Sequence, residues 1–174
     1  MLNEVTPLPA ASAIVVREEP LEVLLLQRHA NSSFVPNAWV FPGGIAERSE
    51  SMAEVAVRET SEEAGIALDP GTLVLTSRWI TPVGIPKRFD TYFFLAKVGR
   101  DAEVTIDGRE ITGWMWIAPA DALARRDLHL VFPTIKNLEA IAPFTSADAL
   151  IDSRRGAVIE PIQPVLVDGK PALR

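Results

Sequence analysis

Cysteine is absent from the chain of 174 residues. Its absence excludes disulfide bonds, thiolate metal sites and a cysteine nucleophile, and it is compatible with a reducing compartment. Basic residues are also few, because 17 Lys and Arg stand against 23 Asp and Glu and give a formal net charge of −6. A broad nucleic-acid-binding surface is therefore not expected. An acidic protein can still bind phosphates where metal ions bridge the two.

Long apolar runs are missing too, and none approaches the roughly 20 residues that a membrane-spanning helix needs. The N-terminus has Glu4, Pro7 and Pro9 where a secretory signal would have a basic start and an apolar run. We therefore expect a cytoplasmic protein that does not enter a membrane. The length is that of one domain, so we expect residues 1–174 to fold together, with residues 1–9 as a loose arm.

Short runs rich in β-branched and aromatic residues predict strands, and clusters of Pro, Gly and polar residues predict the loops between them. Residues 10–17 and 21–28, around a short polar turn, predict a β-hairpin. Further strands are expected at 38–41, 72–80, 89–98 and 111–117, and helices at 119–126 and 133–142. Asp168-Gly169 is a hairpin-turn signal. Together with a helix between the strands, this order predicts an α/β fold in which a mixed β-sheet lies between helical layers.

The stretch from Gly44 to Ile66 is the most unusual part of the chain, because it holds six glutamates and no aspartate. Ser51 and Glu54 form a capping-box pair that begins a helix, and Gly65 suits the position just past its end. The 3.6-residue period predicts that the helix buries a narrow face of small residues. That face consists of Ala53, Ala56, Val57, Thr60 and Ala64.

Three of these glutamates, Glu59, Glu62 and Glu63, stand at spacings that place them on one face of the helix. Like charges at such spacings repel by a few tenths of a kcal/mol per pair on an exposed helix. A solvated acidic face is one explanation of the cluster. A divalent metal bound against the carboxylates explains it better, since hard cations prefer oxygen ligands.

The spacing of residues in this stretch also matches a known sequence pattern. From Gly44 the chain reads Gly, five residues, Glu50, seven residues, and then Arg-Glu-Thr-Ser-Glu-Glu-Ala-Gly-Ile. This pattern resembles the signature of the Nudix hydrolases, G-x5-E-x7-R-E-U-x-E-E-x-G-U, in which U is apolar, and Thr60 is the one departure. The resemblance implies an α/β/α sandwich with a mixed sheet. It also implies hydrolysis of a diphosphate joined to another group, with Mg²⁺ or Mn²⁺.

The resemblance assigns metal binding to Glu59, Glu62 and Glu63. The glycines at positions 43 and 44 let the backbone approach closely, so that a carbonyl of Gly43 or Gly44 can join the coordination sphere. Mg²⁺ keeps several waters and uses few protein carboxylates, which leaves positions for a substrate phosphate.

The resemblance gives the catalytic roles to Glu59, Arg58 and Glu50. Arg58 and Glu50 would pair and hold the helix and Glu59 in orientation, and Glu59 is one candidate for the general base. The family does not place its base uniformly, so a carboxylate from a later loop is the alternative. Glu110, just before a predicted strand, is the preferred one of the three available there, Glu103, Asp107 and Glu110.

Residues before the glutamate helix bear on the substrate. Coenzyme A-cleaving relatives often show L-L-T-x-R-S-x3-R-x3-G-x3-F-P-G-G, and Arg28 stands in register with Phe41 and the glycines that follow it. Ser33 and Asn37 replace the second arginine and the inner glycine of that pattern, so the match is partial.

A second stretch, residues 77–96, is similar to the branch that includes animal acyl-coenzyme A diphosphatases. The residues that carry this likeness are Trp79, Thr81, Pro82, Pro86, Arg88, Phe89 and Asp90. We expect Arg28, Lys87 and Arg88 to bind substrate phosphates. A solvated turn is the structural alternative for Lys87 and Arg88.

The sequence thus predicts an enzyme with a small nucleotide-type substrate and no nucleic-acid or membrane partner, and a homodimer stays an open option. Coenzyme A or an acyl derivative is the first expectation, and ADP-ribose or a dinucleotide is the alternative. A non-catalytic Nudix-fold binding or regulatory module is the alternative of another class. Such modules usually lose glutamates of the Nudix signature, and this chain retains them. The isopentenyl diphosphate isomerase type uses a cysteine that this chain lacks.

Overall fold

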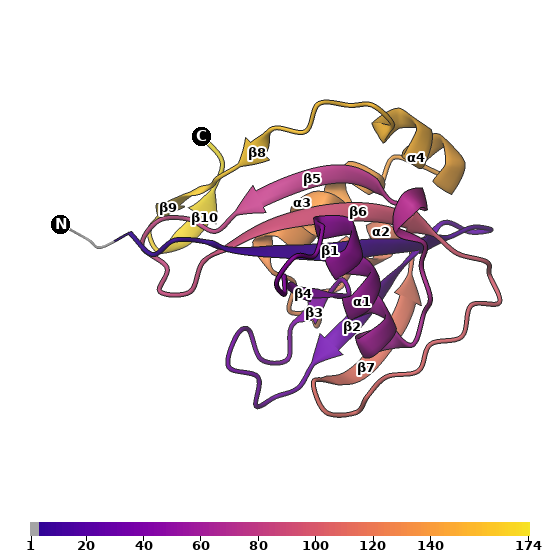
Figure 1. Cartoon of the computed structure of the whole chain (residues 1–174), viewed down its shortest axis with the longest axis horizontal. Helices are drawn as coiled ribbons and strands as arrows, with labels where there is room; N and C mark the ends of the chain where they lie inside the picture. Colours follow the sequence, from indigo (N-terminus) through magenta and orange to yellow (C-terminus); the bar gives the residue numbers. More distant parts are fainter. Residues whose placement is uncertain (1–3) are drawn as a thin grey trace.

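A mixed eight-stranded sheet forms the centre of the computed structural model, which describes residues 4–174 (Figure 1). Its order is β3-β2-β1-β6-β5-β8, with β4 paired to β1 and β7 paired to β2. The β1–β6 and β5–β8 pairs are parallel, and the other pairs are antiparallel. The strands are β1 (Leu8–Arg17), β2 (Glu22–Arg28), β3 (Trp39–Val40), β4 (Gly43–Ile45), β5 (Val74–Ile80), β6 (Phe89–Lys97), β7 (Ile111–Ile117) and β8 (Pro161–Ile162).

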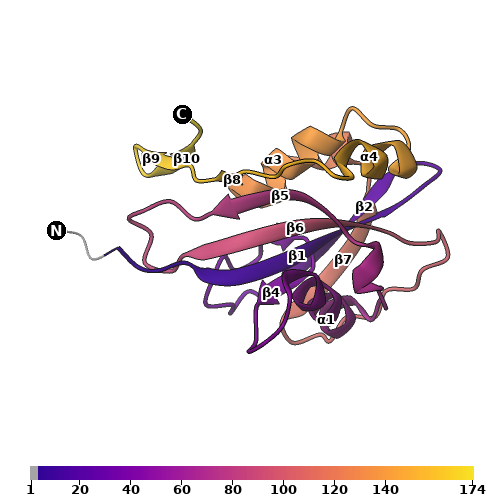
Figure 2. The same cartoon turned by 45° about the horizontal axis from the view of Figure 1, so that its top comes forward.

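Helices cover both faces of this sheet (Figure 2). The helix α1 (Met52–Ala64) lies on one face, and α3 (Phe132–Ile141) and α4 (Ala147–Arg154) lie on the other, where α2 (Pro119–Ala124) packs against α3. A 3₁₀ turn, η1 (Pro70–Thr72), precedes β5. The predicted α/β sandwich is therefore confirmed. No helix within residues 4–174 has the length and apolar character needed to cross a bilayer.

Two hydrophobic cores fill the spaces between the layers, and β1 contributes to both. Ile14 and Val16 face the core beneath α3 and α4, whereas Ala13 and Val15 face the core beneath α1. All four side chains are fully buried. Because successive side chains of a strand point to opposite faces, a strand buried on both sides is a continuous apolar run, which is how residues 13–16 read in the sequence.

Helix α1 begins and ends where the sequence predicts. The hydroxyl of Ser51 accepts from the Glu54 N–H at 3.2 Å, and the Glu54 carboxylate accepts from the Ser51 N–H at 2.7 Å. Gly65 ends the helix in the left-handed conformation, at φ 67°. Its buried face differs from the prediction, since it consists of Val55, Ala56, Thr60, Glu63 and Ala64. The Thr60 hydroxyl donates to the Ala56 carbonyl at 2.7 Å, which satisfies it in an apolar position.

The N-terminal arm is shorter than predicted, because Leu8 and Pro9 already belong to β1. The predicted hairpin over 10–17 and 21–28 is confirmed as β1 and β2. Residues 43–45 form a strand that the sequence does not predict, β4, which pairs with residues 10–12. This pairing fixes the glycines beside the middle of the sheet. Residues 1–3 of the predicted arm lie outside the described part of the chain.

The C-terminal segment adds elements that the sequence predicts only in part. The helix α4 is not predicted, although Ser146 caps it and the Glu18 carboxylate accepts from the N–H groups of its first turn. The strands β9 (Val165–Val167) and β10 (Lys170–Ala172) pair as a hairpin. Asp168 and Gly169 form its turn with φ values of 50° and 76°, as the Asp-Gly signal predicts.

Candidate active site

A cavity of about 940 Å³ lies where α1, β4 and the β5–β6 connection meet. Two groups of side chains stand out in its lining. One group is acidic and includes Glu59, Glu63 and Glu110. The other is apolar and mainly aromatic, and it includes Phe34, Phe41, Trp79, Phe89, Phe93 and Phe132. A cavity of this size fits a nucleotide-sized ligand.

Glu63 is the most deeply placed of these carboxyl groups, with 6% of the residue exposed. Its Oε2 accepts from the Gly43 N–H at 3.0 Å, so β4 fixes its position. Burial raises the pKa of Glu63 to about 8, and the nearby charges of Glu59 and Glu110 act in the same direction. The Gly43 N–H and the Arg28 charge oppose that rise. A cation bound beside Glu63 would favour its charged form.

Glu59 lies one turn away from Glu63 and packs directly on the backbone of Gly44. A Cβ on Gly44 would stand 2.4 Å from the Cδ and Oε1 atoms of Glu59, so only glycine leaves room for this carboxyl group. Burial raises the pKa of Glu59, while the guanidinium of Arg58 acts against it. Glu59 and Glu63 therefore form a partly desolvated pair of carboxyl groups in one wall of the cavity.

Arg58 joins the acidic residues of α1 and of the preceding loop, as predicted. Its Nε donates to Glu50 at 2.6 Å, and its Nη1 donates to Glu59 at 2.7 Å. Its Nη2 also donates to the Ile45 carbonyl at 3.1 Å, which links the helix to β4. The contact with Glu50 fixes Arg58, and Arg58 in turn fixes one oxygen of Glu59.

Glu62 lies apart from this pair. Its side chain is 58% exposed and accepts from Arg58 at 3.3 Å, and it is not part of the cavity lining. Within residues 4–174, no three Asp, Glu or His side chains converge in a preformed metal cage. The structure thus brings together two of the three predicted carboxylate ligands. Two carboxylates suit Mg²⁺, which takes its other ligands from water and substrate phosphate.

The three candidates for a base outside α1 lie in different surroundings. Glu110 lines the cavity with Glu59 and Glu63. Asp107 instead accepts from the N–H groups of residues 109, 110 and 111, and these bonds outweigh its burial and keep its pKa below the ordinary value. Glu103 lies at a separate pocket. Glu110 is therefore the one whose position agrees with the predicted role.

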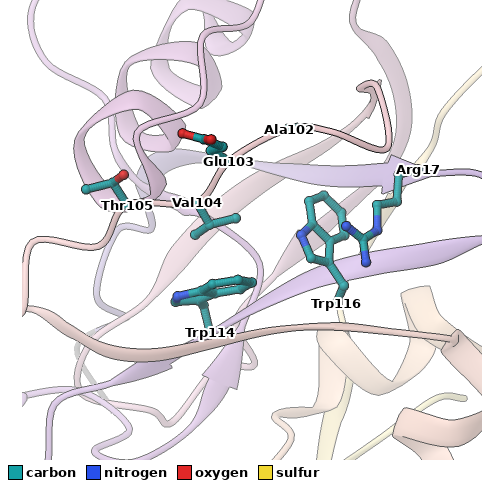
Figure 3. Close-up of a pocket in the computed structure, with 7 residues that line it drawn as sticks. All are labelled: Arg17, Ala102, Glu103, Val104, Thr105, Trp114 and Trp116. Atoms are coloured by element: carbon teal, nitrogen blue, oxygen red, sulfur yellow. The ribbon is translucent and has the colours of Figure 1, made fainter.

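That separate pocket has a volume of about 580 Å³ and lies near the other end of β1 (Figure 3). Trp114 and Trp116 of β7 form one side of it, and the guanidinium of Arg17 stacks over Trp116 at 4.3 Å from the ring centroid. Arg17 follows Ser12, the strand partner of Gly43, by five residues, or roughly 17 Å along β1. The lining of this pocket therefore contains none of the glutamates of residues 44–66.

Of the residues expected to bind phosphate, Arg28 and Lys87 line the cavity. The Nε of Arg28 donates to the Phe34 carbonyl at 2.9 Å, which fixes both the side chain and the loop after β2. The ammonium of Lys87 lies 5.5 Å from the ring centroid of Phe89 and 6.0 Å from that of Phe34. Both cations can therefore reach an anionic ligand in the cavity.

The structure does not place Arg88 with the other residues expected to bind substrate, because its side chain is not part of the cavity lining. Arg88 is 2% exposed. Its guanidinium donates to the carbonyls of Thr81 and Val5, at 3.0 and 2.8 Å, and to the Glu4 carboxylate at 3.0 Å. Arg88 therefore joins the N-terminal arm to the β5–β6 connection, in which Thr81 lines the cavity. It is a structural residue.

We expect Arg88→Ala to lower the free energy of unfolding by about 2 kcal/mol, because it leaves the carbonyls of Thr81 and Val5 without their donor. In a chain of this length that loss lowers Tm by roughly 4–8 °C. Thermal unfolding measures the effect, with Arg155→Ala as the matched control, since Arg155 is 62% exposed in its ion pair with Asp152. If Arg88→Ala instead raised KM and left Tm unchanged, Arg88 would be a substrate-binding residue.

Several lining residues, among them Phe34, Phe93 and Phe132, carry no signal in the sequence. The aromatic wall joins Phe34 from a loop, Phe41 from the β3–β4 connection, Phe93 from β6 and Phe132 from α3. Trp79 packs edge-on against Phe132, with ring centroids 6.0 Å apart. Pro164 and Pro171 reach the cavity from the C-terminal segment. Only the tertiary fold brings these positions together.

Known proteins resemble this chain in sequence and in fold. The family model described as the NUDIX domain matches residues 6–137. A putative 8-oxo-dGTP diphosphatase 3 of Mycobacterium tuberculosis is 29% identical over 147 residues, which cover 84% of this chain and 67% of that protein. An acyl-coenzyme A diphosphatase of Xenopus laevis is 23% identical over an alignment of 234 positions, gaps included, and the alignment covers 74% of this chain and 62% of that protein.

Among solved structures, a NUDIX hydrolase from Alicyclobacillus acidocaldarius superimposes with a TM-score of 0.77 at 25% identity, over 85% of this chain and 96% of that one. The chain spans about half the length of several curated relatives that it matches.

Proposed function

Because the chain belongs to the NUDIX domain family, we propose that it hydrolyses the diphosphate bond of a nucleoside diphosphate-linked substrate with the help of a divalent metal ion. One observation carries this proposal. Glu59 and Glu63, fixed against Gly44 and Gly43, lie in the wall of a cavity large enough for a nucleotide. The acidic side of that cavity suits a metal-bound diphosphate, and the aromatic side suits the groups attached to it.

The residues present fit Mg²⁺ or Mn²⁺. The carboxylates of Glu59 and Glu63 are hard oxygen donors, and they pack against the backbone of Gly44 and Gly43, whose carbonyl groups would offer a third donor of the same kind. Burial disfavours the charge of both carboxyl groups, so an ion of opposite charge would stabilise them. When bound, such an ion neutralises the diphosphate and makes an attacking water more acidic.

Side chains of the protein would orient Glu59, bind the phosphate oxygens and accept the proton of the attacking water. Arg58, fixed by Glu50, orients Glu59. Arg28 and Lys87 meet the phosphate oxygens as positive charges in the lining. Glu59 and Glu110 are the two candidates to accept the proton of the attacking water, since both carboxyl groups belong to the cavity.

Coenzyme A or an acyl-coenzyme A is the substrate that we propose. The register of Arg28 with Phe41, the stretch from Trp79 to Asp90 and the similarity to an acyl-coenzyme A diphosphatase support this choice. The apolar side of the cavity also offers a surface for a pantetheine or acyl group, neither of which needs a charged partner. ADP-ribose and dinucleotides share the same diphosphate chemistry and are the competing substrates.

A substrate screen tests this proposal. The purified protein is incubated with coenzyme A, octanoyl-coenzyme A, ADP-ribose, NADH, diadenosine tetraphosphate and nucleoside triphosphates, each with Mg²⁺, with Mn²⁺ and with EDTA. We expect the highest kcat/KM for the coenzyme A compounds, cleavage into 3′,5′-ADP and a 4′-phosphopantetheine product, and no turnover in EDTA. A preference for ADP-ribose or a dinucleotide would contradict the choice of substrate. Failure with every compound would favour a non-catalytic binding module.

A further inference from the structure

Two segments outside the signature of residues 44–66 also line the cavity. The strand β8 extends the sheet at its edge, where Trp79 pairs in parallel with Ile162. In this register the chain continues alongside the end of β5, so that Pro164 comes to lie near Thr81. The hairpin β9–β10 follows, beside the β5–β6 connection (Figures 1 and 2). This C-terminal segment lies beyond residue 137, where the NUDIX match ends.

The C-terminal segment and the β5–β6 connection touch each other. Leu166 of β9 places its Cδ1 atom 3.5 Å from the position that a Cβ on Gly84 would take. Pro164, which is buried, and Pro171, which is exposed, line the cavity from the C-terminal segment. Pro82 and Ile85 line it from the β5–β6 connection, together with Thr81 and Lys87. The three prolines and the one aliphatic side chain thus form an apolar rim beside these two polar residues.

This rim stands away from the carboxylates. Gly43 pairs with Ser12 on β1, whereas Phe89, which follows the β5–β6 connection, pairs with Leu8. Ser12 and Leu8 are four positions apart along β1, which is roughly 13 Å. That distance exceeds the length of a diphosphate, so the group that meets the rim is the part of the substrate remote from the cleaved bond.

We propose that Pro164, Pro171, Pro82 and Ile85 form a subsite for an uncharged aliphatic group, namely the acyl chain of an acyl-coenzyme A. The assignment rests on the proposed function. It adds a role for the C-terminal segment, which lies outside the matched domain and would bind the acyl chain. Proline and aliphatic side chains offer apolar surface and no charge, and prolines also lack an N–H that would need a partner. Such a surface binds methylene groups by removing them from water.

The subsite predicts a dependence on acyl chain length. Each fully buried methylene strengthens binding by up to about fourfold. Acyl-pantetheines carry the acyl end without a diphosphate, so their binding does not depend on hydrolysis. We expect the affinity of the wild-type protein, measured by isothermal titration calorimetry, to rise from acetyl- through butanoyl- to octanoyl-pantetheine.

Charged substitutions on the two sides of the rim test the location. Pro171→Asp and Ile85→Asp place a carboxylate beside the acyl chain and should each weaken octanoyl-pantetheine binding about tenfold or more. Val167→Asp and Val83→Asp are the matched controls. Val167 and Val83 lie on the same two segments and do not line the cavity, so binding should change less than twofold.

The outcomes separate this inference from the proposed function. No binding of octanoyl-pantetheine by the wild-type protein, no dependence on chain length, or equal effects of the lining and control variants would overturn the subsite. Binding with the expected pattern, but without hydrolysis of any coenzyme A compound, would support the subsite and contradict the proposed activity. Both rim variants are compared at equal folded fraction, confirmed by circular dichroism, so a loss caused by unfolding is recognised.

Discussion

Replacing Glu59 by glutamine is expected to lower kcat by about 10²-fold or more, because Glu59 is both a proposed metal ligand and one of the two candidate bases. The amide keeps the shape of the side chain but loses the negative charge that a metal ion and Arg58 both need. Folding should persist, because Glu59 is only part of the Arg58 network and Glu50 continues to hold that guanidinium. Initial-rate kinetics with the best substrate of the screen, alongside thermal unfolding, measure both effects.

The matched control for Glu59→Gln is Glu139→Gln, the same chemical change on the exposed surface of α3, where Glu139 pairs with Lys136. Its kcat should stay within twofold of the wild-type value. The position of Glu62 outside the cavity predicts that Glu62→Gln has a smaller effect than Glu59→Gln or Glu63→Gln. Full metal-dependent activity in Glu59→Gln would show that the site is assigned to the wrong residues.

Replacing Gly44 by alanine is the second change with a large expected effect. The new methyl group would occupy the space of the Glu59 carboxyl group, at 2.4 Å from its Cδ atom. That carboxyl group is the end of a flexible side chain, so it can move and leave the fold intact. A displacement of about 1 Å in a catalytic group is enough to cost roughly 10²-fold in rate. We expect kcat to fall by about that factor while Tm stays close to the wild-type value.

Gly43→Ala provides the contrast, since here the new Cβ meets backbone. It would stand 2.5 Å from the Ala11 carbonyl oxygen and 2.8 Å from the Ser12 Cα atom, so β1 or β4 must shift. The expected signature is a lowered Tm. If Gly44→Ala kept full activity, or lost stability as Gly43→Ala does, the close packing of Glu59 on Gly44 would have no catalytic role.

The sequence predicts best what depends on near neighbours in the chain. The limits of α1 follow from Ser51, Glu54 and Gly65, and the Arg58–Glu50 contact follows from their spacing along one motif. The turn at Asp168-Gly169 is equally local. Each of these features involves residues at most eight positions apart, so pattern and propensity are sufficient to predict them.

Other features depend on tertiary contacts and could not be read in advance. The helical period allows Glu63 to face either the sheet or solvent, and the Gly43 N–H of β4 decides that it faces inward. In the sequence, Arg88 resembles a surface cation beside a Pro/Gly loop. In the structure it is buried and donates to the carbonyl of Val5, which is 83 positions away. The contribution of Pro164 and Pro171 likewise exists only because β8 joins the edge of the sheet.

The central claim is that Glu59 and Glu63 together bind the divalent ion that supports catalysis. Titration of Mn²⁺ followed by electron paramagnetic resonance tests it most directly, with the wild-type protein, the double variant Glu59→Gln/Glu63→Gln and the Glu139→Gln control. We predict saturable Mn²⁺ binding in the wild type and the control, and a loss of at least about tenfold in affinity in the double variant. Equal Mn²⁺ affinity in all three proteins would contradict the claim.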